Sequence, residues 1–254
     1  MIYPEWRQQL SRSLHLSRSK PEAKYFQVAS ITTDGAPALR TMVFRDHAPR
    51  SNSLLSVTDI RSEKCEQWKA LAEAALHWYF VKSREQYRLR CRVSLIHHNE
   101  AGRIVCSGHE LLQNIHQDGV IEASESACAG ETLKLASSIF KARWEGLSSS
   151  AKASFYCPAP KSAKLSGEGD KINSDKINSD EINSDEASKK SSEGAGTKRE
   201  GDQAQNEQDT ISPHFAVVVF HPFEVDYLDL KSRPHTRNLY SLEQTKWLKQ
   251  SVNP

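Results

Sequence analysis

Apolar residues recur every three or four positions in residues 4–19 and 61–75, so both segments are predicted to be amphipathic helices. These positions are Trp6, Leu10 and Leu14 in the first segment, and Cys65, Trp68, Leu71 and Ala72 in the second. Pro21 and Glu22 begin a short helical stretch before the first strand. Later in the chain, residues 131–144 and 148–156 are also predicted to be helical.

Strand patterns fill most of the space between these helices. Residues 25–32 and 38–45 are separated by Asp34-Gly35, a dipeptide typical of hairpin turns. Residues 53–58 form another short strand. The nearly unbroken apolar run at 76–81 indicates a strand buried on both faces.

Residues 86–96 alternate between apolar and polar side chains, which predicts a strand with one face in the core. The polar face carries Gln86, Arg88, Arg90 and Arg92, and the apolar face carries Tyr87, Leu89, Cys91, Val93 and Leu95. Four polar residues on one face indicate an interface, a ligand or a solvated surface. The strand pattern as a whole predicts a mainly β fold, an antiparallel barrel with peripheral helices.

Residues 159–212 differ in kind from the rest of the chain. They contain no aromatic residue, and the pentapeptide Asp170–Ser174 recurs twice with little change. So little apolar surface cannot offset the entropy of ordering, and we interpret the segment as a disordered insertion. Strands are predicted at 215–220 and 225–230, and a helix at 242–249. The expected organisation is a barrel core at 1–158, the insertion at 159–212 and a segment at 213–254 that completes the barrel.

Composition refines this picture in two ways. Only 37% of residues are hydrophobic and the mean hydropathy is −0.64, which agrees with a normal core diluted by a polar insertion. Outside 159–212 the formal net charge is +6, which suits an anionic ligand. The five cysteines include no C-x-x-C pair, and the histidines show no metal-ligand spacing, so neither a disulfide framework nor a metal site is expected. No signal peptide or membrane span is recognised, and the expected location is the cytoplasm.

Three separated segments offer groups suited to an anionic, planar ligand: Arg40–Arg45, Thr58–Lys64 and Arg84–Arg90. Arginine is the best phosphate partner because its planar fork makes two charge-assisted hydrogen bonds. Arg61 and Lys64 lie where a strand turns into a helix, whose N-terminus also attracts anions. The alternatives are ordinary strand-end charges and a solvated first helical turn. Since Arg40 and Arg45 point to opposite faces of a regular strand, one ligand can use both only across a bulge or between subunits.

In their order along the chain, these segments resemble the pyridoxamine 5'-phosphate oxidase-related, FMN-binding split-barrel proteins. Arg40–Arg45 resembles the family's Arg-x-x-x-x-Lys strand, with Arg45 in place of Lys. Val57-Thr58 is similar to its aromatic-Thr pair, and Ser62-Glu63-Lys64 to its Ser-Arg-Lys. Arg84-Glu85-Gln86 matches Glu-Arg-Gln, and Arg233-Pro-His-Thr-Arg237 matches the C-terminal Arg-x-His-x-Arg.

The resemblance implies FMN as cofactor, a split β-barrel, and a homodimer with FMN at the subunit interface. The cofactor-binding residues it implies are Arg40, Thr41, Met42, Val43, Phe44, Arg45, Val57, Thr58, Arg61, Lys64, Gln86 and Arg237. It places Arg233 and His235 on the substrate side, as candidates for holding an anionic small molecule or moving a proton. An FMN-dependent oxidoreductase is therefore the expected function.

One departure leaves the substrate open. The vitamin B6 oxidases of this family carry a helix with an Arg-Pro-x-x-Ser pattern that grips the substrate phosphate, and residues 97–158 lack it. A non-catalytic split barrel that binds flavin, haem or a deazaflavin is the alternative. The third hypothesis is an interaction protein whose basic face binds nucleic acid or an acidic partner; it predicts salt-dependent binding and no chromophore. The alternating core gives it little support, and we expect no nucleic-acid or membrane partner.

Overall fold

The computed structural model describes residues 3–108, 125–163 and 210–254. Residues 1–160 and 211–254 form one compact unit, and the following description concerns that unit. Most of the expected insertion at 159–212 lies outside the described residues. The helices are α1 (Glu5–Leu16), η1 (Pro21–Lys24), α2 (Glu63–Ala70), α3 (Glu125–Glu145) and α4 (Ser149–Ser154). The strands are β1 (Tyr25–Ile31), β2 (Pro37–Val43), β3 (Asp46–His47), β4 (Leu54–Asp59), β5 (Glu73–Phe80), β6 (Glu85–His98), β7 (Ile104–Gly108), β8 (Phe215–Asp229), β9 (Thr236–Glu243) and β10 (Lys246–Val252).

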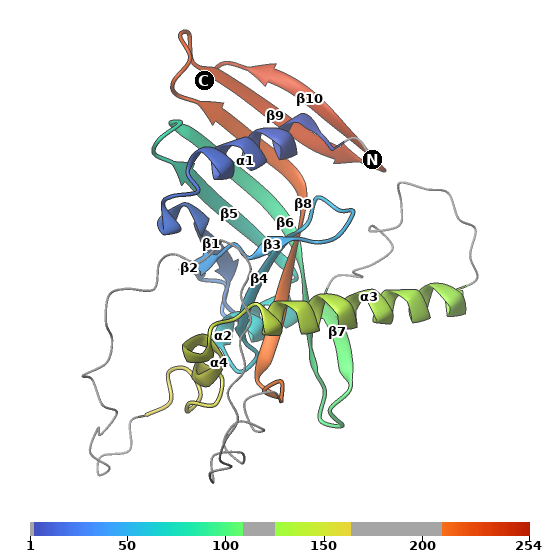
Figure 1. The fold of residues 1–254 in the computed structure, drawn as a ribbon. Coiled ribbons are helices and arrows are strands. Elements are labelled where there is room, and N and C mark those ends of the chain that lie inside the picture. The colour runs from blue at the N-terminus through green and yellow to red at the C-terminus, as the bar shows by residue number, and fades with distance from the viewer. Residues whose placement is uncertain (1–2, 109–124, 164–209) are drawn as a thin grey trace, which may run out of the picture. The chain divides into compact units, whose positions relative to one another are not determined.

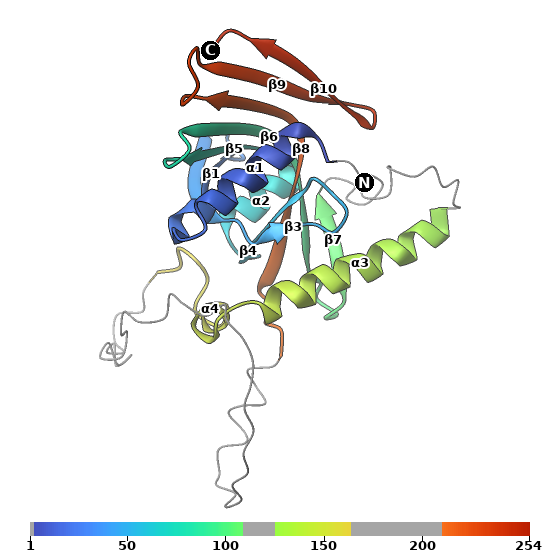
Figure 2. The same ribbon diagram turned by 45° about the horizontal axis from the view of Figure 1, so that its top comes forward.

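The strands form one antiparallel sheet in the order β10-β9-β8-β6-β5-β1-β2, which confirms the mainly β fold with peripheral helices (Figure 1). Its two long strands, β6 and β8, pair with each other over most of their lengths. The first half of β8 also pairs with β4, and its second half pairs with β9. The long strands therefore join the barrel to the C-terminal hairpin, and the view in Figure 2 shows that hairpin rising above the barrel.

The main core lies on one face of this curved sheet. The apolar residues of β6 from Tyr87 to Leu95 are buried, as their alternation predicted. Trp78 packs against the rings of Phe26, Phe44 and Phe80 at centroid distances of 5.2–5.3 Å. Aromatic packing of this kind contributes beyond its buried area.

Two helices cover further apolar surface. Helix α1 buries Trp6, whose ring lies 5.2 Å from that of Trp247 in β10. Helix α3 forms a second core with the start of β8, where Phe140 and Trp144 lie 5.0 Å and 5.1 Å from Phe215. The helices predicted near 131–144 and 148–156 are therefore confirmed in α3 and α4.

Two predictions in the middle of the chain were wrong. The helix expected over 61–75 ends at Ala70, and β5 begins at Glu73. The run at 76–81 is buried on one face only, because His77 and Tyr79 are exposed on the other. Strand β5 belongs to an antiparallel sheet, in which one face can meet solvent.

Two predictions at the C-terminal end were also wrong. The strands expected at 215–220 and 225–230 are one strand, β8, which continues through Pro222 by a register shift opposite Arg90 and Cys91. Bulges of this kind tolerate proline within a sheet. The helix expected at 242–249 is instead the hairpin of β9 and β10, with Gln244 at φ +54° in the turn.

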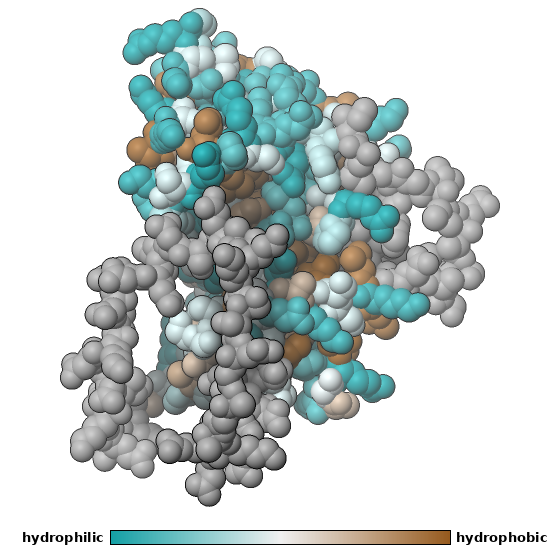
Figure 3. Space-filling view, in the orientation of Figure 1, coloured by the Kyte–Doolittle hydropathy of each residue, from teal (hydrophilic) through white to brown (hydrophobic). Residues whose placement is uncertain are grey.

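The visible surface is largely hydrophilic, with a cluster of hydrophobic side chains at the level of α3 (Figure 3). Within the described residues, no helix combines the length and apolar character needed to cross a bilayer.

Candidate functional site

Arg40 and Lys64 lie near each other at the start of α2, on the core side of the sheet. Arg40 is paired with Val28 across β1 and β2, so its side chain lies on the same face as the core residues. Its Nη2 donates to Gln67 Oε1 of α2 at 3.1 Å, and its Nη1 donates to Ser30 Oγ. Lys64 Nζ donates to Ser62 Oγ at 2.9 Å, and Thr58 Oγ1 lies 3.4 Å from the same hydroxyl.

This group, here called the Arg40–Lys64 cluster, consists of Ser30, Arg40, Thr58, Ser62, Lys64 and Gln67. Burial lowers the pKa of Lys64, and the positive charge of Arg40 lowers it further. Burial also lowers the pKa of Arg40, while Glu63 opposes that change. Two partly desolvated cations held together, with hydroxyl and amide groups beside them, fit a dianionic phosphate such as that of FMN.

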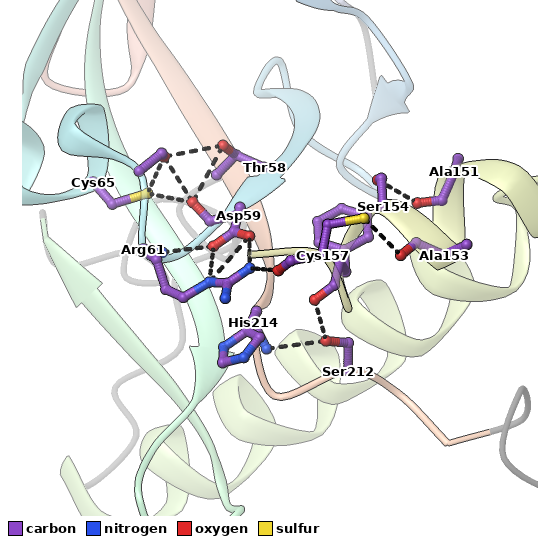
Figure 4. A network of polar contacts seen from close by, with 12 residues as sticks. Thr58, Asp59, Arg61, Cys65, Ala151, Ala153, Ser154, Cys157, Ser212 and His214 are labelled. Atoms are coloured by element: carbon purple, nitrogen blue, oxygen red, sulfur yellow. Dashed lines mark hydrogen bonds and ion pairs between the residues drawn. The ribbon is translucent and has the colours of Figure 1, made fainter. Parts of the chain in front are cut away.

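Arg61 has a different role in the structure. Its guanidinium makes a two-point ion pair with Asp59, with Nη2–Oδ2 at 2.6 Å and Nε–Oδ1 at 3.0 Å, and it also donates to the carbonyl of Cys157 (Figure 4). The hydrogen bonds that Arg61 donates to the Asp59 carboxylate raise the pKa of Arg61. Arg61 thus joins the turn after β4 to the end of α4, and it contributes no contact to the Arg40–Lys64 cluster among those observed.

Gln86 and Arg237 lie on the opposite face of the sheet, which we call the outer face. Leu228 pairs with both of them, so the three form one row across β6, β8 and β9. Arg237 donates from Nε and Nη2 to the carboxylate of Asp226 at 3.0 Å and 2.8 Å. Burial opposes ionisation of Asp226, but hydrogen bonds and charges from Arg237 and Arg88 outweigh it and lower the pKa of Asp226.

Arg233 and His235 lie in the loop between β8 and β9. His235 Nδ1 donates to the backbone carbonyl of Ser232 at 3.0 Å, which leaves Nε2 as the acceptor nitrogen. Arg233 is exposed and has no side-chain partner within the described residues. His235 and Arg237 together line an open cavity of about 960 Å³ beside α1.

The remaining expected contacts are divided between the two faces. Met42 and Phe44 are buried in the core, whereas Thr41 is exposed on the outer face. Val43 is half-buried at the end of β2, and Val57 is half-buried in β4. Arg45 follows β2, where its backbone N–H donates to Leu55 at 2.9 Å and its side chain is exposed.

The expected residues thus form two groups that one chain does not bring together. Gln86 lies in β6, three strands from the β2 strand of Arg40, and Arg237 lies in β9, five strands from it. Five strand spacings correspond to about 24 Å along the sheet. The Arg40–Lys64 cluster lies on the core side, and Gln86 and Arg237 lie on the outer face.

Sequence reasoning missed the residues that hold the arginines. Ser30 and Gln67 bind Arg40, and Asp226 binds Arg237. Gln67 is a buried polar residue next to the buried Trp68 in α2. Its place beside a core tryptophan is the one feature of the sequence that could have indicated a buried hydrogen-bonding role. Among the residues that the structure describes, no group of three His, Cys, Asp or Glu side chains is placed to hold a metal ion.

Part of the chain matches a known domain. Residues 3–97 match the family model described as pyridoxamine 5'-phosphate oxidase, FMN-binding domain. The chain is 33% identical over 91 residues to pyridoxine/pyridoxamine 5'-phosphate oxidase 2 of Arabidopsis thaliana, a match that covers 36% of this chain and 46% of that protein. The chain therefore spans about half the length of this curated relative.

Two solved structures resemble the whole chain. One is a pyridoxamine 5'-phosphate oxidase-related, FMN-binding protein from Nostoc punctiforme, with a TM-score of 0.68, 25% identity and full coverage of both chains. The other is PhzG from Burkholderia lata in complex with tetrahydrophenazine-1-carboxylic acid, with a TM-score of 0.55, 16% identity, and coverage of 100% of this chain and 98% of that one; it shows the shared fold. Residues 3–97 thus match an FMN-binding domain of the pyridoxamine 5'-phosphate oxidase family, and the whole chain is similar in fold to a protein related to that family.

Proposed function

We propose that the protein is an FMN-dependent oxidoreductase that acts as a homodimer on a small anionic substrate. Each flavin site would be composite. One chain would supply the Arg40–Lys64 cluster for the phosphate, and the other would supply Gln86 and Arg237 from its outer face.

The observation that carries this proposal is the separation of the two groups onto opposite faces of one sheet. A second copy of the chain would supply the missing group. In a two-fold symmetric dimer the outer face of each subunit would meet the Arg40–Lys64 cluster of the other, which makes two equivalent sites. The outer face also exposes apolar residues: Leu39 is 72% exposed and Leu248 is 47% exposed. Apolar residues gathered on one face are typical of a surface that binds a partner.

When bound, FMN would supply the electron and hydride chemistry, while the protein supplies binding and orientation. Arg40 and Lys64 would neutralise the phosphate, and the amide of Gln86 offers both a donor and an acceptor to the flavin edge. Arg233 would attract the acidic group of a substrate. His235, whose Nε2 is an acceptor, would receive or return a proton.

The first experiment is the visible spectrum of the purified protein, followed by denaturation and identification of the released flavin. FMN at about one molecule per chain is expected. A colourless protein that FMN cannot reconstitute would exclude the proposal. A flavin-loaded protein that transfers no electrons from any amine or reduced substrate would identify a flavin carrier instead.

The composite site has its own test. Arg40→Ala and Arg237→Ala subunits should each lose FMN as homodimers. When the two are co-expressed with different tags, the mixed dimer should recover one intact site, because both substitutions fall in the other site. If each site were built within a single chain, the mixed dimer would remain empty.

A further inference from the structure

A second cavity lies between three segments that are far apart in sequence: the loop joining β3 and β4, the bend of β8, and the turn between β9 and β10. Its volume is about 450 Å³, large enough for a small organic molecule. None of the residues expected at the flavin site lines it.

The charge around this cavity has one sign. Arg50 and Lys246 line it, and its lining contains no Asp or Glu. Within the described part of the chain, neither cation has an ion pair or a side-chain hydrogen bond. Arg50 also adopts the left-handed backbone conformation, with φ at +51°, which is uncommon for a residue with a side chain. Both cations line the same cavity from separate segments, and neither forms an ion pair there with a described residue, although Glu243 is the cross-strand neighbour of Lys246. This arrangement favours an anion in the cavity.

A polar group in the cavity wall favours a ligand that carries a hydrogen-bond donor. Asn52 Oδ1 is buried and has no hydrogen-bond partner among the described residues. A buried acceptor without a partner costs free energy, so a ligand that donates to it would be favoured. Beside it, Ser53 Oγ lies 2.8 Å from Nδ1 of His221, a side chain that is 8% exposed. This side of the cavity is therefore fixed by internal hydrogen bonds.

Aromatic side chains supply the third component. Tyr3 and Trp247 both line the cavity. The indole of Trp247 makes a T-shaped contact with that of the buried Trp6, with ring centroids 5.2 Å apart, so the core restricts its orientation. A fixed aromatic surface favours a planar ligand.

We propose that this cavity binds a small aromatic acid that carries a ring hydroxyl or N–H group. Its carboxylate lies between Arg50 and Lys246, its ring packs against Trp247, and its donor bonds to Asn52 Oδ1. The proposal concerns binding alone and does not depend on turnover at the flavin.

The test is isothermal titration of the full-length protein with 4-hydroxybenzoate, compared with 4-hydroxybenzyl alcohol, which lacks the charge, and benzoate, which lacks the donor. We expect one binding site per chain for 4-hydroxybenzoate, with weaker binding of both analogues. Arg50→Gln and Lys246→Gln should each weaken binding about tenfold, the range for loss of a charge-assisted hydrogen bond. Lys20→Gln, at an exposed position outside the cavity, is the matched control and should change nothing.

Three results would overturn the proposal. They are no binding of 4-hydroxybenzoate up to about 10 mM, equal binding by the charge variants and the parent protein, and equal binding of the neutral alcohol. Since aromatic acids can also stack on a flavin, the visible spectrum is recorded during the titration. A probe that perturbs the flavin absorption and is unaffected by Lys246→Gln would lie at the flavin and would also refute the cavity assignment.

Discussion

Arg237 is held by Asp226 through two hydrogen bonds, from Nε at 3.0 Å and from Nη2 at 2.8 Å, and this pair fixes the guanidinium in the row that contains Gln86. The same carboxylate also accepts a hydrogen bond from Arg88. The arginine that we assign to the flavin is therefore oriented by a neighbour on the adjacent strand, before any ligand arrives.

We expect Asp226→Asn to weaken FMN binding severalfold, because Arg237 would lose the charged partner that orients it. The measurement is the dissociation constant of FMN from the reconstituted protein, followed by flavin fluorescence. Glu224→Gln is the matched control, since Glu224 pairs with Arg90 on the same face one row away. If both variants lost the same FMN affinity, Asp226 would act only through the net charge of the outer face and not by orienting Arg237.

Lys64→Ala should weaken FMN retention by about tenfold or more, because the phosphate would lose one of its two cations. Lys69→Ala tests the specificity of that effect: Lys69 lies on the same helix but pairs with the exposed Glu66. Flavin content per chain after gel filtration gives the comparison. Unchanged content in Lys64→Ala would remove Lys64 from the phosphate site.

A buried carboxylate holds α1 onto the barrel. Glu85 is 1% exposed and accepts hydrogen bonds from Ser13 at 2.6 Å and from Tyr227 at 2.7 Å. Removing the phenol hydroxyl in Tyr227→Phe should lower the free energy of unfolding by about 1.5–3 kcal/mol, the range for hydrogen bonds to charged groups. Urea denaturation of the flavin-free protein measures it. Tyr79→Phe, at an exposed position, should lie within about 0.5 kcal/mol of the parent protein.

His47 makes stability depend on pH. Burial, with the nearby charge of Arg7, lowers the pKa of His47 to about 3 from a usual value of 6.5. Between these values the unfolded chain binds a proton that the folded chain does not, so stability falls as the pH drops below about 6.5. The loss is about 1.6 kcal/mol between pH 6.5 and 5, because the slope reaches its full value of about 1.4 kcal/mol per pH unit only well below pH 6.5.

Replacing this imidazole with a group that does not titrate should remove that loss. The slope of unfolding free energy against pH, between pH 5 and 6.5, should flatten in His47→Gln. In His15→Gln, at an exposed position of α1, the slope should stay as in the parent protein. The same slope in His47→Gln as in the parent would show that another group controls acid stability.

A hydrogen bond joins the last residue of the expected insertion to a residue just before its start. Ser212 Oγ donates to the backbone carbonyl of Phe155 at 3.1 Å, and both residues are buried. We expect a chain in which a short Gly-Ser linker replaces residues 164–209 to keep its FMN content and its dimeric state, measured by absorbance and light scattering. Loss of either property would show that the segment takes part in the fold.

Some of the fold was predictable because its signals are local. The alternation predicted the two faces of β6 as far as Arg92, since a strand repeats every two residues whatever its partners. Beyond Arg92 both faces are buried, because Ile96 packs in the second core with α3. The strands expected at 215–220 and 225–230 are one because a bulge opposite Arg90 and Cys91 lets β8 continue through Pro222, and that bulge depends on the partner strand. Residues 242–249, which belong to the hairpin of β9 and β10, were predicted to be helical because short apolar segments fit either period.

The sequence was enough to identify the cations of the candidate site, but it did not reveal how they are arranged. Arg40, Lys64 and Arg237 stand out as residue types that bind phosphate, whereas their partners Gln67 and Asp226 do not. Arg61 has the same chemistry as Arg40, but its two-point pair with Asp59 engages it elsewhere. Which carboxylate neutralises which arginine depends on strand register, and register is a property of the assembled sheet.

Strand β8 has a consequence for the synthesis of this protein. It pairs with β4, β6 and β9, yet it is translated long after β4 and β6 and just before β9, from residue 215 onward. Until the ribosome has passed Asp229, β4 and β6 have open edges and their apolar residues lack a covering strand. The nascent chain must therefore wait for most of its length before the barrel closes, and a product truncated before Phe215 should aggregate instead of folding.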